Sequence, residues 1–239
     1  MDALKTLLKN VFFPQNYTCT FCGREIFGNK PLCRDCDSAL PRNDRYICDR
    51  CGRKTPYPTT ACSDCAGKTL YFDVARSAFT YDAPISFALQ NLKYRGRKFL
   101  AEELAAEMEK TYLKTFYPCE AVVCVPTSEN KIKERGYNQS ELLASALSKR
   151  ISVPFIRGAL VKTRDTGSQV GLSQKERLIN LSGSFAVKDR KLIEDKTVLL
   201  IDDVLTTGTT TNLAAKKLKS AGAKSVFILT AASVTLGRS

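Results

Sequence analysis

The sequence predicts an α/β fold, built on a mainly parallel, doubly wound sheet, with a small cysteine-rich domain in front of it. In the second part of the chain, unbroken apolar runs alternate with helical patterns, as they do where helices cover both faces of parallel strands. In the first part, eight of the ten cysteines fall within residues 19–65, where large apolar residues are few. We therefore expect a small domain over residues 1–67 and a larger one over residues 68–239.

The chain is basic and contains no histidine. The formal net charge is +13, of which +3 falls on residues 1–67 and +10 on residues 68–239. Such a charge suits polyanions, either nucleic acid or phosphorylated ligands, although a solvated basic surface would give the same count. The lack of histidine excludes serine–histidine triads, histidine acid–base catalysis and histidine metal ligands.

Nothing in the sequence indicates a secreted or membrane-inserted protein. No apolar run is long enough to cross a bilayer. Residues 1–13 lack the apolar core of a signal peptide, and their leucines, Val11 and Phe12 instead mark a short amphipathic helix. We therefore expect a cytoplasmic protein with no membrane insertion.

The cysteines of the first part form four C-x-x-C pairs in a repeated segment. Each of the first four cysteines recurs 29 positions later, and Cys22-Gly23-Arg24 is echoed by Cys51-Gly52-Arg53. Two such pairs form a tetrahedral Cys₄ site, because each pair makes a knuckle whose two sulfurs point at one ion. Two repeats therefore predict two structural zinc ions. The expected ligands are Cys19, Cys22, Cys33, Cys36, Cys48, Cys51, Cys62 and Cys65.

Two alternatives to this assignment stay open. A disulfide framework would need an oxidising compartment, which nothing in the sequence suggests. A crossed arrangement, in which knuckles from different repeats share an ion, would use the same eight ligands. With four thiolates per ion no position is left for water, so we expect structural and not catalytic zinc. Because the segment is poor in large apolar residues, metal binding must supply its folding energy, about 10–16 kcal/mol per site.

Residues 68–125 contribute the first strands and helices of the larger domain. We expect a strand over residues 74–81, a helix from Pro84 to Leu92, a helix from Leu100 to Leu113 and a buried strand over 121–125. Cys124 lies in that last strand and is expected to be a core residue. Between the two helices, residues 92–99 interleave four cations with aromatic residues. This segment is either an anion or nucleic-acid contact or a solvated turn.

A charged loop is expected after the strand at 121–125, leading into a helix over residues 142–147. The loop carries Thr127 and Ser128, and then the cations Lys133 and Arg135. In α/β folds a loop at the C-terminal end of a strand is where ligands bind. Residues 163–173 are polar and contain glycine, so they predict a second loop, with a capping box for a following helix at its end. That loop is either a cover for a bound ligand or a plain surface loop.

The stretch that organises the chain is Val198–Thr210. Four apolar residues lead to Asp202 and Asp203, and a Thr/Gly turn then leads into a helix over Asn212–Leu218, with a last strand at 225–230. The turn consists of Thr206, Thr207, Gly208, Thr209 and Thr210. Such a turn offers N–H groups and hydroxyls to an anion, and the helix dipole favours negative charge there. Adjacent carboxylates suit ribose hydroxyls or Mg²⁺, so a sugar phosphate fits between them. An ordinary buried strand with an acidic turn is the plain alternative.

This stretch resembles the phosphoribosyl pyrophosphate (PRPP) loop of the type I phosphoribosyltransferases, whose pattern is four hydrophobic residues, two acidic residues and a Thr-Thr-Gly or similar turn. The resemblance implies a type I phosphoribosyltransferase fold. It also implies that Asp202 and Asp203 are catalytic, because they hold the ribose hydroxyls and indirectly Mg²⁺, and that residues 206–210 cradle the 5′-phosphate.

The same resemblance implies a pyrophosphate site. Thr127, Ser128, Lys133 and Arg135 would receive the departing pyrophosphate. The loop at 163–173 would close over PRPP, exclude water and bring Arg164 to the pyrophosphate.

The chain as a whole is similar to the ComF family of late-competence proteins, which join an N-terminal zinc ribbon to a phosphoribosyltransferase domain. Four features carry this resemblance in the family's order: the cysteine repeat, Leu92-Lys93-Tyr94-Arg95-Gly96, Arg135-Gly136-Tyr137-Asn138-Gln139 and the PRPP loop. The resemblance implies a part in DNA uptake and natural transformation, with other competence proteins as partners.

Two functions follow, and the sequence leaves both open. The first is transfer of phosphoribosyl from PRPP to an unknown acceptor, with Mg²⁺ and release of pyrophosphate. The second is a module without turnover, which senses PRPP or another ribose 5-phosphate, or binds single-stranded DNA. No element that reads a purine or pyrimidine base is recognisable in the sequence. A purely structural scaffold does not explain the intact Asp202–Gly208 stretch.

Overall fold

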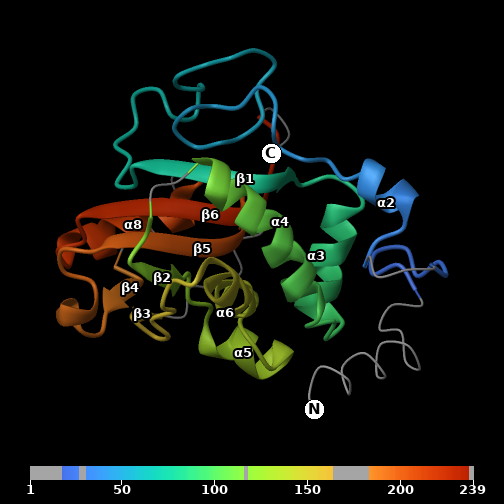
Figure 1. Ribbon diagram of the computed structural model, residues 1–239. Coiled ribbons are helices and arrows are strands. Elements are labelled where there is room, and N and C mark those ends of the chain that lie inside the picture. The colour runs from blue at the N-terminus through green and yellow to red at the C-terminus, as the bar shows by residue number, and fades with distance from the viewer. Residues whose placement is uncertain (1–17, 27–30, 116–117, 164–182, 237–239) are drawn as a thin grey trace.

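The computed structural model describes residues 18–26, 31–115, 118–163 and 183–236. Its centre is a sheet of four strands: β1 (Val74–Thr80), β2 (Ala121–Cys124), β5 (Thr197–Leu205) and β6 (Ser225–Ser233). They lie in the order β1-β6-β5-β2, and every neighbouring pair is parallel (Figure 1). The predicted α/β fold with a parallel sheet is therefore confirmed.

Helices cover one face of this sheet, and a helix with a small hairpin covers the other. The first face carries α3 (Ile85–Tyr94), α4 (Leu100–Thr115) and α6 (Gln139–Ile151), and the second carries α8 (Thr209–Ser220) with β3 (Leu160–Lys162) and β4 (Phe185–Val187). Along β5, Leu199 and Ile201 join the first core, while Val198 and Leu200 join the second. Alternate side chains are buried on opposite faces, which explains the unbroken apolar run.

Two short helices complete the described elements, together with a single 3₁₀ turn. These are α2 (Arg34–Ser38), α5 (Glu129–Arg135) and η1 (Arg190–Leu192). The prediction of a loop over 131–139 is wrong in its first half, where α5 forms. Ser128 stands at the N-cap of α5, and Gly136 ends it in the left-handed region with φ of 79°. The charged residues between Ser128 and Gly136 are good helix formers. The sequence analysis did not identify this helix because it has no apolar face.

The strand β5 also extends further than its apolar run. It continues to Leu205, so Asp202 and Asp203 lie within the strand, near its C-terminal end, and not after it. The predicted N-terminal amphipathic helix and nearly all of the loop at 163–173 lie outside the described residues. Because all four strands are parallel, their C-terminal ends meet at one edge of the sheet, where α3, α5 and α8 begin.

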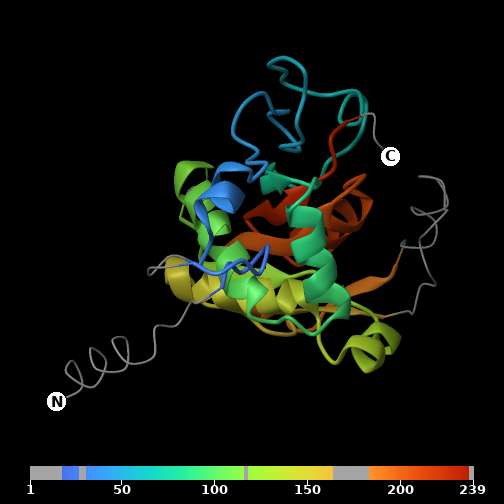
Figure 2. The same ribbon diagram turned by 90° about the vertical axis from the view of Figure 1, so that its right-hand side faces the viewer.

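The cysteine-rich segment lies along the free edge of β1. Three backbone hydrogen bonds connect them: the N–H of Ala75 to the carbonyl of Arg50 (2.8 Å), Asn43 to Ala78 (3.0 Å), and Thr80 to Pro41 (2.8 Å). Figures 1 and 2 both show the later part of the segment, after α2, on the side of β1 away from β6, whereas Figure 1 shows α2 itself beside α3. The contact covers a strand edge that would otherwise expose unpaired backbone groups.

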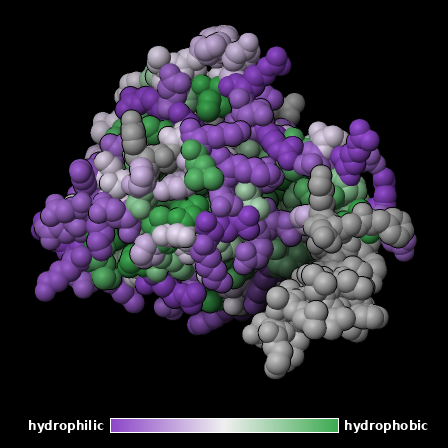
Figure 3. All heavy atoms as spheres, viewed as in Figure 1, coloured by the Kyte–Doolittle hydropathy of each residue, from purple (hydrophilic) through white to green (hydrophobic). Residues whose placement is uncertain are grey.

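Within the described residues, no helix has both the length and the apolar character needed to cross a membrane. Figure 3 shows that hydrophilic residues dominate one face of the molecule, where apolar side chains form separate small groups.

Candidate active site and zinc centres

The eight N-terminal cysteines form two separate clusters. Cys19, Cys22, Cys33 and Cys36 bring their sulfurs within 4.8 Å of one another, and so do Cys48, Cys51, Cys62 and Cys65. We call residues 19–36 the first cysteine unit and residues 48–65 the second cysteine unit. All ten cysteines lie in the described ranges and all are free thiols, so the disulfide alternative is wrong. The crossed arrangement is wrong too, because each cluster uses the cysteines of one repeat.

The sulfur geometry fits zinc. A tetrahedron with zinc–sulfur bonds of about 2.3 Å has edges of about 3.8 Å. The Cys22–Cys33 sulfurs are 3.8 Å apart, and the Cys51–Cys62 sulfurs are 3.7 Å apart. In both units the backbone N–H of the third cysteine donates to the sulfur of the first, 14 positions earlier, at 3.3 Å: from Cys33 to Cys19 and from Cys62 to Cys48. Four sulfurs fill a tetrahedral ion, so each centre is structural.

A polar cavity of about 250 Å³ opens at the C-terminal edge of the sheet. Asp202 and Asp203 form its floor, and Thr210 contributes from the start of α8. Further polar side chains of its lining come from α3, α5, α6 and β3. They are Lys93, Tyr94, Lys131, Arg135, Gln139, Ser140 and Lys162. We call this the acid cavity.

Each carboxylate of the acid cavity has its own partner. The Lys93 ammonium lies 2.7 Å from an oxygen of Asp203, and the Ser140 hydroxyl donates to Asp202 at 2.8 Å. Burial, reinforced by the negative charge of Asp203, raises the pKa of Asp202 to about 7. Burial alone would lower the pKa of Lys93, but the Asp203 and Asp202 carboxylates outweigh it and the pKa is raised. Asp203 is therefore paired with a cation, whereas Asp202 has a pKa near neutrality.

The Arg135-to-Gln139 run builds the wall of this cavity, one residue at a time. The Arg135 guanidinium stacks 4.8 Å above the Tyr94 ring and donates to Gln139 Oε1 at 3.3 Å. Gly136 ends α5, and the Tyr137 hydroxyl donates to the Leu92 carbonyl. Asn138 caps α6 by accepting from the Ser140 N–H at 3.1 Å, and its amide donates to Val125 O at 3.0 Å. The motif therefore fixes α3, α5 and α6 to the end of β2.

The Thr/Gly turn, residues 206–210, joins β5 to α8, and we call it the phosphate loop. Gly208 holds φ of 75° at the N-cap of α8, which a residue with a side chain rarely adopts. The hydroxyls of Thr207 and Thr209 lie 3.0 Å apart in a hydrogen bond. From the second cysteine unit, the Arg53 guanidinium donates to the Thr206 carbonyl at 3.1 Å. The loop is thus held from behind, with the first turn of α8 open to an anion.

The predicted pyrophosphate residues are only partly gathered at the acid cavity. Thr127 and Arg135 line it. Ser128 is buried at the N-cap of α5, and Lys133 lies on the exposed side of that helix, outside the lining. Lys131, two residues earlier, faces the cavity instead. Arg164 lies outside the described residues.

Several polar residues of the site were missed by the sequence analysis as site residues, among them Lys93, Lys131, Ser140, Lys162 and Arg53. Lys93 belongs to the 92–99 segment, whose cations and aromatic residues were a usable signal. The structure divides that segment: Lys93 and Tyr94 reach the acid cavity, whereas residues 95–99 are exposed. Ser140 and Arg53 gave no signal, because a serine in a helix and an arginine after a knuckle are ordinary at those positions.

Two family models match the chain: the phosphoribosyl transferase domain over residues 132–236 and the double zinc ribbon domain over residues 8–66. Competence protein F of Haemophilus influenzae is 28% identical over 220 residues, which cover 89% of this chain and 95% of that protein. Competence protein ComFC of Bacillus subtilis is 30% identical over 210 residues, covering 83% of either chain. Among solved structures, the glutamine PRPP amidotransferase of B. subtilis, complexed with ADP and GMP, is 18% identical, with a TM-score of 0.42 over 59% of this chain and 30% of its own.

Proposed function

The chain belongs to the ComF family of competence proteins, with a double zinc ribbon and a type I phosphoribosyltransferase fold, and from this premise we propose that it binds PRPP with Mg²⁺ in the acid cavity. We further propose that it transfers the phosphoribosyl group to a nitrogen acceptor and releases pyrophosphate. The observation that carries this proposal is the paired acids Asp202 and Asp203, which share the acid cavity with four cations and with Thr210 at the start of α8.

The acids would hold the ribose. Ionised carboxylates accept hydrogen bonds from the two ribose hydroxyls, and the 5′-phosphate would then lie on the N–H groups of residues 206–210. Asp202 and Asp203 would also help to hold a Mg²⁺ at the ribose, since this ion prefers a few carboxylates together with waters and phosphate oxygens. When bound, Mg²⁺ would neutralise the pyrophosphate oxygens.

The cations would serve the leaving group. As the bond from ribose C1 to the pyrophosphate oxygen breaks and the acceptor nitrogen bonds to C1, negative charge builds up on pyrophosphate. Lys93, Lys131 and Arg135 face the cavity where that charge would develop, with Thr127 beside them. Ser128, Lys133 and Arg164 remain predicted members of this site. Because Lys93 is paired to Asp203, its ammonium must give way when a ribose hydroxyl takes that carboxylate, and pyrophosphate is its natural new partner.

A titration of PRPP with Mg²⁺ into the zinc-loaded protein tests the binding. We expect Asp203→Asn to weaken PRPP at least tenfold, because a charge-assisted hydrogen bond contributes about 1.5–3 kcal/mol. The matched control is Asp195→Asn, at an exposed acid just before the start of β5 and outside the lining of the acid cavity. The left-handed backbone of Asp195, with φ of 58°, tolerates asparagine. Wild-type protein that does not bind PRPP, or equal losses in both variants, would contradict the proposal.

Pyrophosphate release separates catalysis from sensing. The protein is incubated with PRPP, Mg²⁺ and a panel of bases, and pyrophosphate is followed. Base-dependent release that is lost in Asp203→Asn supports transfer. PRPP binding with no release under any base supports the second candidate, a PRPP sensor within the transformation machinery.

A single-stranded DNA contact is the other candidate, and one observation favours it. Tyr94 and Phe99 are 63% and 55% exposed, with the cations Arg95, Arg97 and Lys98 exposed between them. Exposed aromatic rings among cations suit stacked bases and phosphates. Through this surface the protein would contact DNA and other competence proteins. A cytoplasmic location stays a prediction.

Binding of a fluorescent oligonucleotide at rising salt tests this surface. We expect affinity to fall with salt and to drop about fivefold in Phe99→Ala, since stacking of one base contributes about 1–3 kcal/mol. The matched control is Phe87→Ala, because Phe87 is also exposed, at 63%, but lies on α3 away from the cations of 95–98. Affinity that ignores salt, or equal losses in both variants, would rule out this contact.

A further inference from the structure

A second cavity, of about 420 Å³, lies behind the phosphate loop. The second cysteine unit forms one wall, the segment Leu70–Phe72 forms another, and the start of α8 forms the third. It shares no lining residue with the acid cavity, but the two meet at neighbouring threonines. Thr207 and Thr209 face this cavity, and Thr210 faces the acid cavity. We call it the rear cavity.

The walls of the rear cavity combine an apolar surface with positive charge. Leu70, Phe72, Leu205 and Leu213 supply the apolar part. The charged part consists of Arg53, Lys68 and Lys216 together with one acid, Asp64, and the zinc ligands Cys51 and Cys65 lie in the same wall, next to Arg53. Asp64 is neutralised, because its carboxylate lies 2.7 Å from the Arg53 guanidinium. The positive charges that remain beside the Arg53–Asp64 pair are those of Lys68 and Lys216, both exposed at the mouth.

An aromatic face lies beside this charge. The Lys216 ammonium stands 4.9 Å above the ring of Tyr71. A cation over a ring places an anion-binding group and an aromatic face next to each other. A ligand that matches both would have a planar ring system for the apolar wall and a negative group for the two lysines.

The rear cavity is preformed and not a gap between loose segments. Asn212 clamps the wall at 70–72 to α8, since it accepts from the Tyr71 N–H at 2.8 Å and donates to the Thr69 carbonyl at 3.0 Å. Arg53 fixes the opposite wall to the phosphate loop through Thr206. Cavities of about 300–1,000 Å³ that are mostly apolar, with a few polar groups, are typical of small-molecule sites.

We propose that the rear cavity binds a small aromatic anion, with its ring against Leu70 and Leu213 and its negative group at Lys68 and Lys216. Such an occupant touches Thr207 and Thr209, at the tip of the phosphate loop. Its binding therefore changes the affinity for PRPP, and PRPP changes the affinity for the aromatic anion by the same factor. The binding itself stands apart from the proposed function, whereas this reciprocal effect rests on it.

The probe is 8-anilinonaphthalene-1-sulfonate, which carries aromatic rings and one negative charge but no sugar or phosphate, so it does not imitate PRPP. We expect one saturable site on the zinc-loaded chain. Leu213→Trp fills the cavity and should abolish that site. Lys68→Glu inverts a charge at the mouth and should weaken binding about tenfold, because the attraction between the lysine and the sulfonate becomes a repulsion. Lys188→Glu, at an exposed lysine elsewhere, is the matched control and should leave binding unchanged.

Folding of Leu213→Trp is checked by its thermal transition, and Lys68→Glu keeps the test valid if that variant fails to fold. Probe binding that is the same in wild type, Lys68→Glu and Lys188→Glu means attachment to exposed apolar residues only, and overturns the proposal. Saturation with the probe should alter the PRPP dissociation constant; no change would overturn the contact with the phosphate loop. Failure of PRPP to bind at all would refute the proposed function while leaving the site for the aromatic anion standing.

Discussion

Residues 19–36 and residues 48–65 fold into two units with the same internal hydrogen bonds and different surroundings. Thr18 bridges Glu25 in the first, and Ile47 bridges Lys54 in the second, 29 positions later in each case. The burial differs: Cys22 is exposed, whereas all four cysteines of the second unit are buried. The second unit packs its sulfurs around Leu205, at the end of β5, in a cluster of their own.

One ion pair occurs in both units and shows the difference most directly. Arg24 pairs with Asp35 in the first unit, where 66% and 70% of the two side chains are exposed. The equivalent Arg53–Asp64 pair has 7% and 39% exposed, and Arg53 also donates to the phosphate loop. A surface pair contributes little, but a buried arginine must keep its partners. The same sequence unit is therefore peripheral in one copy and a support of the candidate site in the other.

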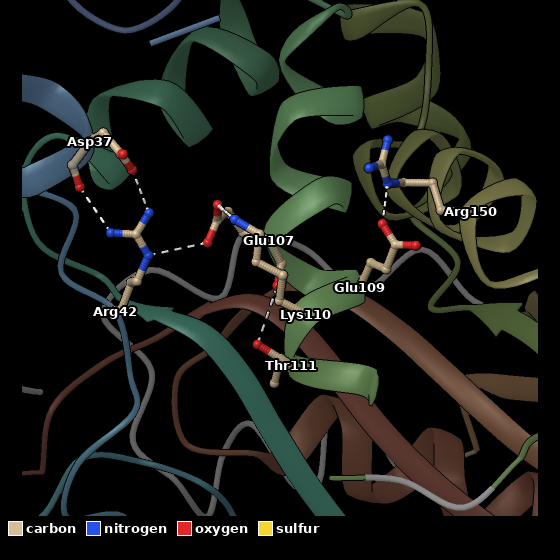
Figure 4. A network of polar contacts seen from close by, with 7 residues as sticks. All are labelled: Asp37, Arg42, Glu107, Glu109, Lys110, Thr111 and Arg150. Carbon is tan, nitrogen blue, oxygen red and sulfur yellow. Dashed lines mark hydrogen bonds and ion pairs between the residues drawn. The ribbon is translucent and has the colours of Figure 1, made fainter. Parts of the chain in front are cut away.

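The two units are also attached by different interactions. The first packs Phe21 and Leu32 against the core of the first sheet face. Just after it, Arg42 binds the carboxylates of Asp37 (2.6 Å) and of Glu107 on α4 (3.2 Å), as Figure 4 shows. The second approaches β1 so closely that only glycine fits: a Cβ on Gly52 would lie 2.4 Å from the carbonyl oxygen of Ala75. At the equivalent Gly23, a Cβ would meet nothing within 4 Å.

Loss of a zinc ligand should separate the units most strongly. Cys51→Ser should remove the second zinc, whose binding contributes about 10–16 kcal/mol to folding, and should destabilise the sheet too, because the second unit packs on β1 and around Leu205 of β5. Cys22→Ser should remove the first zinc and leave the sheet folded. Zinc content and thermal unfolding by circular dichroism measure both. Equal effects of the two substitutions would end the distinction between a supporting and a peripheral unit.

The two glycines give a second comparison. Both have positive φ, 69° at Gly52 and 74° at Gly23, so the backbone cost of alanine is shared. Gly52→Ala adds a clash with backbone atoms of β1 and should lower the free energy of unfolding by about 3 kcal/mol more than Gly23→Ala. Denaturant unfolding measures the difference. A difference near zero would mean that the second unit can move off β1 at no cost.

The two arginines test the support of the phosphate loop. Arg53→Gln should weaken PRPP about tenfold, since it removes a buried hydrogen bond to the Thr206 carbonyl. Arg24→Gln should leave PRPP affinity unchanged. Zinc content must be equal in the two variants, so that affinity reports the position of the loop and not loss of metal. PRPP affinity that is unaffected by Arg53→Gln would remove the second unit from the site.

The smallest expected effect concerns pH. Because the pKa of Asp202 is raised to about 7, the folded chain holds a proton there that the unfolded chain has lost above about pH 4. The stabilisation that this bound proton gives the folded chain is fully present below about pH 4 and is lost as the pH rises through about 7. Ribose hydroxyls need the ionised acid, so PRPP affinity should rise, about tenfold at most, from pH 6 to pH 8. The rise in PRPP affinity should be the same in Arg24→Gln, because the first unit does not touch the acid cavity. Titration calorimetry of PRPP binding at the two pH values measures the rise in wild type and in this variant.

Much of the architecture was predictable from local patterns. The apolar runs identified β2, β5 and β6, since strands buried on both faces need no alternation. The spacing of the cysteines identified both ion sites, because a C-x-x-C knuckle is local and two of them enclose one metal. Helix α5 was missed because it is short and has no apolar face. The division at residue 67 stays a prediction.

The contacts made across the fold were not predictable. Lys93 meets Asp203 across 110 positions of sequence, and Arg53 meets Thr206 across 153. Neither spacing has a local signature, because packing of separate elements brings these side chains together. The repeat made the two cysteine units look equivalent. Only the tertiary structure placed one of them behind the phosphate loop.

By itself, the sequence determined the kinds of groups in this protein: two sets of four thiolates, a pair of acids, and a Thr/Gly turn before a helix. These depend on neighbouring residues, whose spacing fixes which atoms can point the same way. Tertiary structure alone decided which groups face one another: which acid is paired with a cation, which titrates near neutrality, and which zinc unit supports the site. Those properties depend on burial and on distances between remote segments, which no local pattern contains.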